Sequence, residues 1–176
     1  MIYSKCYDTV TGYIFSPDHK KILLVKKRFS GKIMAPGGHV ENEETYIEAL
    51  LREMREETGL GSDRLKRIRI TDRLLTSGED FKVIEAQQDE DFIVIEQISR
   101  LVYYYDHIYC FVIDDEHLTH IKSTEVSKVF WQNVSDIHSL NMYSNIKQTI
   151  AFYYSYLIKS SSLQNNSVKE GKNGQD

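Results

Sequence analysis

The chain has 176 residues, of which 41% are hydrophobic and 27% are charged, and its formal net charge is -4. This composition is ordinary for a soluble globular protein, and the length suits one domain with a sizeable core. The acidic balance lacks the basic excess of a non-specific nucleic-acid binder, and no stretch approaches the roughly 18 apolar residues of a membrane span.

The start of the chain predicts two strands followed by a loop. Residues 7–15 (YDTVTGYIF) and 21–27 (KILLVKK) are rich in β-branched, aromatic and aliphatic side chains, and the segment SPDHK between them is typical of a turn. We therefore expect a hairpin. Residues 28–42 contain three glycines and a proline, which predicts a loop because glycine permits backbone conformations that a side chain would forbid.

A helix is predicted next, from about Glu43 to Thr58. Asn42 is the expected N-cap, and Gly59 is placed to end the helix in a left-handed conformation. The helical prediction comes from apolar residues that recur at three- and four-residue spacing. These core-facing residues are Ile47, Leu50, Leu51 and Met54.

The rest of the chain predicts five further strands and a second amphipathic helix at residues 141–158. This order of elements indicates an α/β (α+β) fold in which a mixed sheet is flanked by helices. The predicted strands are residues 65–76, 81–86, 92–98, 100–114 and 125–134. The apolar stripe of the second helix is Met142, Ile146, Ile150, Tyr153 and Leu157.

The boundaries and the location of the protein follow from composition. We expect one domain over residues 1–159, followed by a disordered tail over residues 160–176, because that polar segment cannot offset its own ordering entropy. Cys6 and Cys110 have no CxxC spacing, and the N-terminus has no signal-peptide pattern. These features favour a cytoplasmic protein without disulfides.

Three glutamates, Glu53, Glu56 and Glu57, lie on one side of the predicted first helix, beside its apolar face. At about 100° per residue they share about 100° of the helix surface. Like charges at this spacing repel one another, whereas a hard divalent cation prefers such oxygen ligands. Helix geometry alone leaves both a solvated face and a metal site open.

The spacing around these glutamates resembles the Nudix box, the signature of the Nudix hydrolase superfamily. Five residues separate Gly38 from Glu44, and seven more lead to the segment REMREETGL, residues 52–60. Every specified position of the signature matches. Over about residues 5–158 the chain resembles the family in pattern, which implies a Nudix-like mixed β-sheet sandwiched between α-helices.

The resemblance implies an enzyme that uses Mg²⁺ or Mn²⁺ to cleave the diphosphate linkage of a nucleoside diphosphate joined to another moiety, by attack of water on phosphorus. Such substrates include nucleoside triphosphates and nucleotide sugars. Glu56 and Glu57 match the family's main metal ligands. Glu53 matches a ligand that also orients or deprotonates the water, and the backbone carbonyl of Gly37 or Gly38 commonly adds a ligand.

Other residues of the box have supporting roles by the same resemblance. Glu44 and Arg52 match the pair that joins the segment before the helix to the catalytic helix. Gly37 and Gly38 shape the loop, and Gly59 permits the turn that ends the helix.

An acidic residue outside the box often completes the metal site in this family. Glu125 is our choice, because it precedes the segment VSKVFW and so lies at the start of a strand near the end of the domain, where such residues occur in the family. Glu90, Asp91 and Glu96 are the alternatives, and plain surface charge is the alternative for all four.

Basic and aromatic residues near the box are candidate substrate contacts. Lys27 and Arg28, together with Lys26, end the second strand, and one of them is expected to contact a substrate phosphate unless this is a solvated strand end. His39 is either a substrate contact or an ordinary loop histidine. The aromatic run from Tyr103 to Tyr109 favours core packing over base stacking, because alternation sends half its rings inward. Trp131 is likewise expected in the core.

The substrate is not fixed by the sequence. Glu43 stands where the family often has glycine, and the segment KIMAPGG lacks the tryptophan that commonly precedes PGG. Alternatives to a nucleotide-like small molecule are the 5′ end of RNA, against which the net negative charge argues, and a non-catalytic Nudix-fold binding module, against which the intact glutamates argue. By analogy with the family, the chain could form a homodimer.

Overall fold

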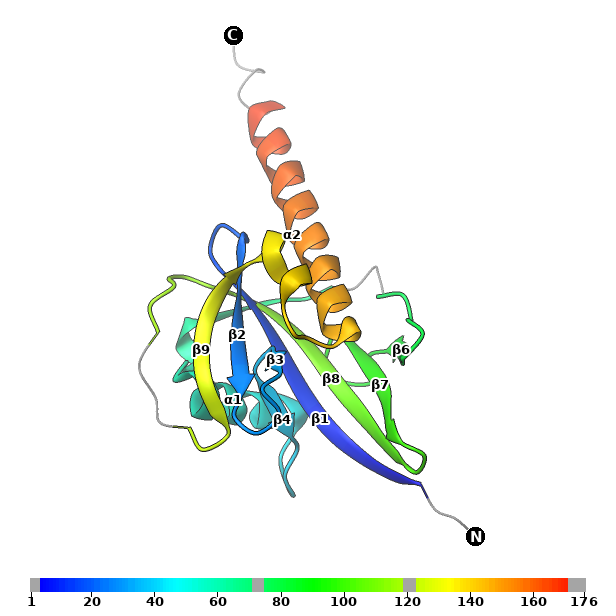
Figure 1. The fold of residues 1–176 in the computed structure, drawn as a ribbon. Coiled ribbons are helices and arrows are strands. Elements are labelled where there is room, and N and C mark those ends of the chain that lie inside the picture. The colour runs from blue at the N-terminus through cyan, green and yellow to red at the C-terminus, as the bar shows by residue number, and fades with distance from the viewer. Residues whose placement is uncertain (1–3, 71–74, 119–122, 171–176) are drawn as a thin grey trace.

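The computed structural model describes residues 4–70, 75–118 and 123–170, and Figure 1 shows one sheet with helices α1 and α2 on opposite faces. The sheet order is β3-β2-β1-β8-β7-β6, with β4 beside β1, β5 beside β8 and β9 beside β2. The strands are β1 (Lys5–Phe15), β2 (Lys21–Lys27), β3 (Ile33–Met34), β4 (Gly37–His39), β5 (Leu65–Ile68), β6 (Phe81–Glu85), β7 (Phe92–Ser99), β8 (Val102–Ile113) and β9 (Val126–Asn133). The helices are α1 (Tyr46–Thr58) and α2 (Ser144–Glu170), with short 3₁₀ helices η1 (Ser62–Arg64) and η2 (Val134–Ser139).

The pairing of the strands confirms the mixed sheet. β1 and β8 run parallel over eleven residue pairs, while the other paired strands are antiparallel. The predicted hairpin is present, with Phe15 of β1 opposite Ile22 of β2. A parallel pair needs a long connection. Here that connection brings residues 97 positions apart in the sequence side by side, as in the pair of Thr9 and Asp106.

The glycine-rich segment is not the plain loop that the sequence predicts. It contains β3, which pairs with β2, and β4, which pairs with β1 so that Gly38 lies opposite Val10. The physical reason is that backbone N–H and C=O groups near the core need partners, and the neighbouring strands supply them. The pairing holds β4 beside β1.

Helix α1 begins later than predicted. Its N-cap is Thr45, whose hydroxyl accepts the backbone N–H of Glu48, while the Glu48 carboxylate accepts the backbone N–H of Thr45. The predicted cap, Asn42, is therefore wrong, because Glu43 has a left-handed backbone (φ 69°) that interrupts any helix starting before it. The predicted end is confirmed, since Gly59 adopts φ 74° and its N–H bonds to the carbonyl of Arg55.

The two helices cover separate hydrophobic clusters. On one face, Leu50 and Met54 of α1 pack with Val10 and Tyr109, and Gly12 lets Met54 approach the sheet because a β-carbon at Gly12 would overlap the Met54 side chain. On the other face, the predicted stripe is buried, with Met142 just before α2 and its other members in α2, and all five are less than 9% exposed. That stripe is confirmed.

Two further predictions differ in extent. The structure continues α2 to Glu170, whereas the sequence predicts disorder from residue 160. Extending an existing helix costs far less free energy than nucleating one. In addition, the hydroxyls of Ser160 and Ser161 donate to backbone carbonyls four residues earlier. Residues 171–176 lie outside the described residues. The predicted strand at 65–76 is shorter, because β5 ends at Ile68 and residues 71–74 also lie outside the described part.

The aromatic and cysteine predictions have mixed outcomes. Tyr109 is fully buried, but Tyr104, in the same run, lines a cavity on the α2 face. Trp131 is half-buried against the α1 cluster. Both cysteines are free. Across the three described ranges, no helix has the length and apolar character to cross a membrane.

Candidate active site

Arg52 joins three parts of the Nudix box. Its Nε and Nη2 atoms donate to the two carboxylate oxygens of Glu44 at 2.7 and 3.0 Å, and its Nη1 donates to Glu53 Oε1 at 2.8 Å. Nη2 also donates to the backbone carbonyl of His39 at 3.0 Å. Hydrogen bonding to Glu44 raises the pKa of Arg52 further and lowers the pKa of Glu44. The predicted pair is present, and it fixes α1 relative to the end of β4.

Glu57 is held by a buried ion pair. Its side chain is 2% exposed, its Oε1 contacts the ammonium of Lys27, and its Oε2 accepts the backbone N–H of Gly37 at 3.0 Å. Lys27 Nζ also donates to the carbonyl of Gly37 at 3.2 Å. Burial raises the pKa of Glu57, and the charge of Lys27 opposes that rise. Lys27 therefore contacts one oxygen of the box, on Glu57, and one of Gly37, the residue just before the box.

Glu53 and Glu56 lie in different environments. The Glu53 carboxylate lies directly against Gly38, where any β-carbon would overlap it, so glycine is needed for this approach. Glu56 is exposed, and its nearest basic group is Arg52 Nη1 at 3.6 Å. Arg52 thus contacts or neighbours both glutamates, while Lys27 neutralises Glu57.

The oxygens gathered here suit a hard divalent cation. Three glutamates and the Gly37 carbonyl supply the carboxylate and carbonyl donors that Mg²⁺ and Mn²⁺ prefer. The Lys27 ammonium, seated between Glu57 and Gly37, shows that a positive charge fits among these donors. Within the described ranges, however, no three acidic, histidine or cysteine side chains converge closely enough to hold a metal ion. Metal binding would require the glutamates to turn away from their basic partners.

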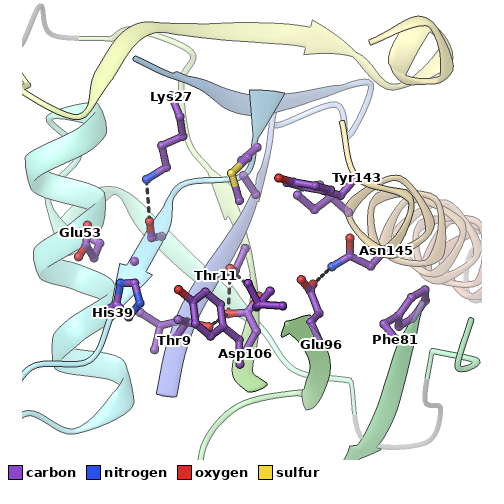
Figure 2. A pocket seen from close by; sticks show the side chains of 18 of the residues that line it. Thr9, Thr11, Lys27, His39, Glu53, Phe81, Glu96, Asp106, Tyr143 and Asn145 are labelled. Atoms are coloured by element: carbon purple, nitrogen blue, oxygen red, sulfur yellow. Dashed lines mark hydrogen bonds between the residues drawn. The ribbon is translucent and has the colours of Figure 1, made fainter. Parts of the chain in front are cut away.

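A cavity of about 800 Å³ extends from these residues across the sheet toward α2 (Figure 2). One end, which we call the glutamate end, is lined by Lys27, Gly37, Gly38 and Glu53. A cavity of this volume accommodates a ligand of nucleotide size. Glu56 and Glu57 do not line it, because the first points to solvent and the second is buried behind Lys27 and Gly37.

The opposite part of the cavity, which we call the acidic end, is formed by Asp106 of β8, Glu96 of β7 and Asn145 of α2. Asp106 accepts hydrogen bonds from the hydroxyls of Thr9 and Thr11 at 2.8 to 3.1 Å. Desolvation raises the pKa of Asp106 to about 7, against the effect of these hydroxyls. Burial also raises the pKa of Glu96, whose Oε1 accepts from the Asn145 amide.

The remaining predicted residues are divided between the cavity and other parts of the fold. Glu125 is exposed and lines the cavity just before β9. His39 lines it too, with its ring edge-on to those of Tyr7 and Tyr104. Arg28 does not line it, since its guanidinium donates to the backbone carbonyls of the 123–126 segment.

Of the alternatives to Glu125, only Glu96 reaches the cavity. Asp91 is buried against Arg67 and the hydroxyl of Tyr153, and Glu90 lies 3.5 Å from the ring of His107. Both pairs are parts of the packed interior.

Sequence reasoning missed Asp106, Asn145 and the two threonines. For the two threonines a signal exists in the alternation of β1, because Thr9 and Thr11 occupy the same face as the buried Tyr13 and therefore had to face inward. Asn145 adjoins the apolar stripe of α2 and is similarly out of place in it.

Comparison with known proteins agrees with this architecture. The family model described as NUDIX domain matches residues 7–153. An uncharacterized Nudix hydrolase, YvcI of Bacillus subtilis, is 32% identical over 133 residues, which is 76% of this chain and 70% of the relative.

Two solved structures share the fold at low sequence identity. A C. elegans Ap4A hydrolase has a TM-score of 0.65 at 13% identity, with 87% of this chain and 98% of that chain covered. The E. coli dihydroneopterin triphosphate pyrophosphohydrolase has a TM-score of 0.60 at 18% identity, with 89% and 99% covered. The family-model match and the 32% identical relative establish that the chain belongs to the Nudix hydrolase family.

Proposed function

We propose that the protein is a metal-dependent pyrophosphohydrolase that cleaves the diphosphate linkage of a nucleotide-like small molecule. The observation that carries this proposal is the position of Glu53, which lies on α1 beside Glu56 and Glu57 and also faces a cavity of nucleotide size. Names of proteins with the same fold, an Ap4A hydrolase and a triphosphate pyrophosphohydrolase, support phosphate-anhydride substrates.

The proposed roles of the residues in metal binding and catalysis follow from their positions. Glu56 and Glu57 would hold Mg²⁺ or Mn²⁺ with the Gly37 or Gly38 carbonyl, and Glu125 is the candidate ligand from outside the box. When bound, the cation would offset phosphate charge and lower the pKa of water. Glu53, which accepts a hydrogen bond from Arg52 and lies against Gly38, would orient and deprotonate the attacking water.

Lys27 is the candidate contact for a substrate phosphate. Its ammonium borders the cavity, whereas Arg28 bonds to backbone carbonyls, so of the two predicted basic residues Lys27 is the better placed. His39, at the edge of the cavity, is the other candidate substrate contact.

The test is hydrolysis of a panel of nucleoside triphosphates and nucleotide sugars with Mg²⁺, with products identified in ¹⁸O-labelled water. We expect Glu56→Gln and Glu57→Gln to lower kcat by about 100-fold or more, because removing one group that stabilises developing charge costs about 10²–10³ in rate. Glu56→Gln is the cleaner variant, since Glu56 is exposed and the substitution leaves the buried Lys27 pair intact.

Glu85→Gln is the matched control, because it removes the same charge from an exposed position at the end of β6, and it should retain full activity. Undiminished turnover by both box variants would refute the metal assignment. Including triphosphorylated RNA in the panel tests the RNA alternative, and tight nucleotide binding without any product would indicate a non-catalytic module.

A further inference from the structure

The charge of the cavity is strongly uneven. Six acidic residues line it, whereas among its described lining residues Lys27 is the only lysine or arginine, and Lys27 lies at the glutamate end. Phosphate groups carry negative charge and are compatible with Lys27 and bound cations. A further anionic group would be repelled by the acidic end, which lies across the sheet from Lys27.

Asp106 is placed to accept hydrogen bonds from a ligand. Its described partners are the hydroxyls of Thr9 and Thr11, and no ion pair within the described residues neutralises it. Two neutral hydroxyls leave part of the acceptor capacity of a carboxylate unused, because its two oxygens offer about four lone-pair sites. The parallel pairing of β1 and β8 holds these three side chains on one face of the sheet.

Glu96 and Asn145 extend this acceptor surface. Glu96 Oε1 accepts from the Asn145 amide, and no other contact engages the Glu96 carboxylate in the described structure. Figure 2 shows the two side chains pointing toward each other from β7 and α2, on the same side of the cavity as Asp106. A ligand that brings only acceptors would leave these desolvated carboxyl groups without partners, which is costly.

The walls between these polar groups are apolar or aromatic. Met34, Phe81, Tyr104 and Ile146 line the cavity and offer flat or flexible surfaces to a ring. A planar ring buries apolar faces against such walls while its edge meets the polar groups.

We propose that the acidic end selects substrates in which the group remote from the diphosphate is a planar heterocycle bearing an amino group, whose N–H donors reach Asp106 and Glu96. This inference rests on the proposed function, because it assumes that the diphosphate lies at the glutamate end. It makes Asp106 and Glu96 specificity-determining residues, distinct from the glutamates of α1.

Two matched nucleotide pairs test the proposal. CMP and UMP differ by amino against oxo at C4, with N3 changing from an acceptor to an N–H donor, and GMP and IMP differ only by the 2-amino group. We would measure dissociation constants of all four with the metal-free, full-length protein by NMR or calorimetry. We expect the amino-bearing member of at least one pair to bind about tenfold more tightly, the size of one good hydrogen-bonded base contact.

The variants Asp106→Asn and Glu96→Gln should abolish that preference. Each should raise the dissociation constant of the amino-bearing nucleotide about tenfold and change that of the other member of the pair little. Glu85→Gln, the exposed control, should keep it. Two isosteric variants are used so that a folding defect in one leaves the other informative. Equal affinities within both pairs, absence of binding by all four, or a preference that survives both variants would overturn the proposal.

Binding and turnover separate this proposal from the proposed function. Amino-selective binding without hydrolysis of the matching triphosphates would uphold the acidic end and refute the enzyme. Hydrolysis that depends on Glu56 but treats CTP like UTP and GTP like ITP would uphold the enzyme and refute the selectivity.

Discussion

Glu57 and Asp106 are two carboxylic acids whose different neighbours give them different chemistry. Desolvation raises the pKa of both. Lys27 contacts Glu57 and favours its ionised form, whereas the hydrogen-bond partners of Asp106 within the described residues are the neutral hydroxyls of Thr9 and Thr11. Consequently Glu57 is suited to hold positive charge, and Asp106 is suited to change protonation near neutral pH.

The elevated pKa of Asp106 predicts a pH dependence of stability. The folded pKa of about 7 exceeds the ordinary value of 3.8, so between these values the folded state holds more protons than the unfolded state. The contribution of Asp106 to stability is therefore greatest below about pH 4 and is lost as pH rises to about 7, by at most about 4 kcal/mol.

Denaturant unfolding at pH 5 and pH 8 checks this expectation. Asp106→Asn should be less sensitive than the wild type to the change from pH 5 to pH 8, because it cannot titrate. Asp114→Asn, at an exposed position, should behave like the wild type. An unchanged pH sensitivity in Asp106→Asn would show that Asp106 does not titrate in this range.

At the scale of the element, α1 is fixed at both ends and along one face. Thr45 and Glu48 cap its start, Gly59 ends it, and Met54 packs against Gly12 of β1. Since the cap and the packing set the rotation of the helix, they also set where Glu53 points. The positions of the glutamates thus depend on residues that have no chemistry of their own.

The capping box gives a prediction for this element. Thr45→Ala removes the hydroxyl that accepts the Glu48 N–H and should lower the free energy of unfolding by about 1 kcal/mol. Asn42→Ala is the control, because Asn42 is exposed and lies outside the cap, and it should change stability by less than about 0.5 kcal/mol. A larger loss from Asn42→Ala than from Thr45→Ala, measured by urea denaturation, would contradict the assigned helix start.

At the scale of the whole molecule, a buried polar network joins elements from distant parts of the chain. The Tyr153 hydroxyl on α2 donates to Asp91 Oδ2 at 2.6 Å, and Arg67 of β5 donates to both oxygens of the same carboxylate. Asp91 directly precedes β7, so the network connects α2 to the sheet. The acidic end, which needs both α2 and β7, depends on this docking.

Removing one hydroxyl tests the docking. Tyr153→Phe should cost about 1–3 kcal/mol of folding free energy, because it takes a hydrogen bond from a buried carboxylate. Tyr154→Phe removes the same atom from a half-buried neighbour and should cost less. Equal effects of the two variants in denaturant unfolding would mean that the Asp91 contact contributes little.

The sequence predicts best those features that depend on residues close together in the chain. The end of α1 is predictable because Gly59 adopts a conformation that other residues avoid, and the stripe of α2 follows from a single period. The start of α1 was missed, because Asn42 and Thr45 are both good caps. The capping-box spacing from Thr45 to Glu48 and the left-handed backbone of Glu43 decide for Thr45.

The acidic end could not be predicted for a different reason. Asp106 meets Thr9 through the pairing of two strands whose residues lie 97 positions apart. Alternation shows which side chains share a face of one strand, but it does not show which strand lies beside it. The glutamates of α1 share a single helix, so the box was visible in the sequence and the far side of the cavity was not.

β1 also has a geometric consequence for any substrate. In β1, Thr9 pairs with Asp106 of β8 on one side, and Thr11 pairs with Gly37 of β4. A single strand therefore has neighbours from both ends of the cavity. The separation of those ends is therefore built into hydrogen-bond register and cannot adapt to the ligand. Under the proposed binding mode, β1 fixes the distance between the site of the ring and the site of the diphosphate. The length of the substrate from ring to phosphorus then decides which anhydride bond faces Glu53.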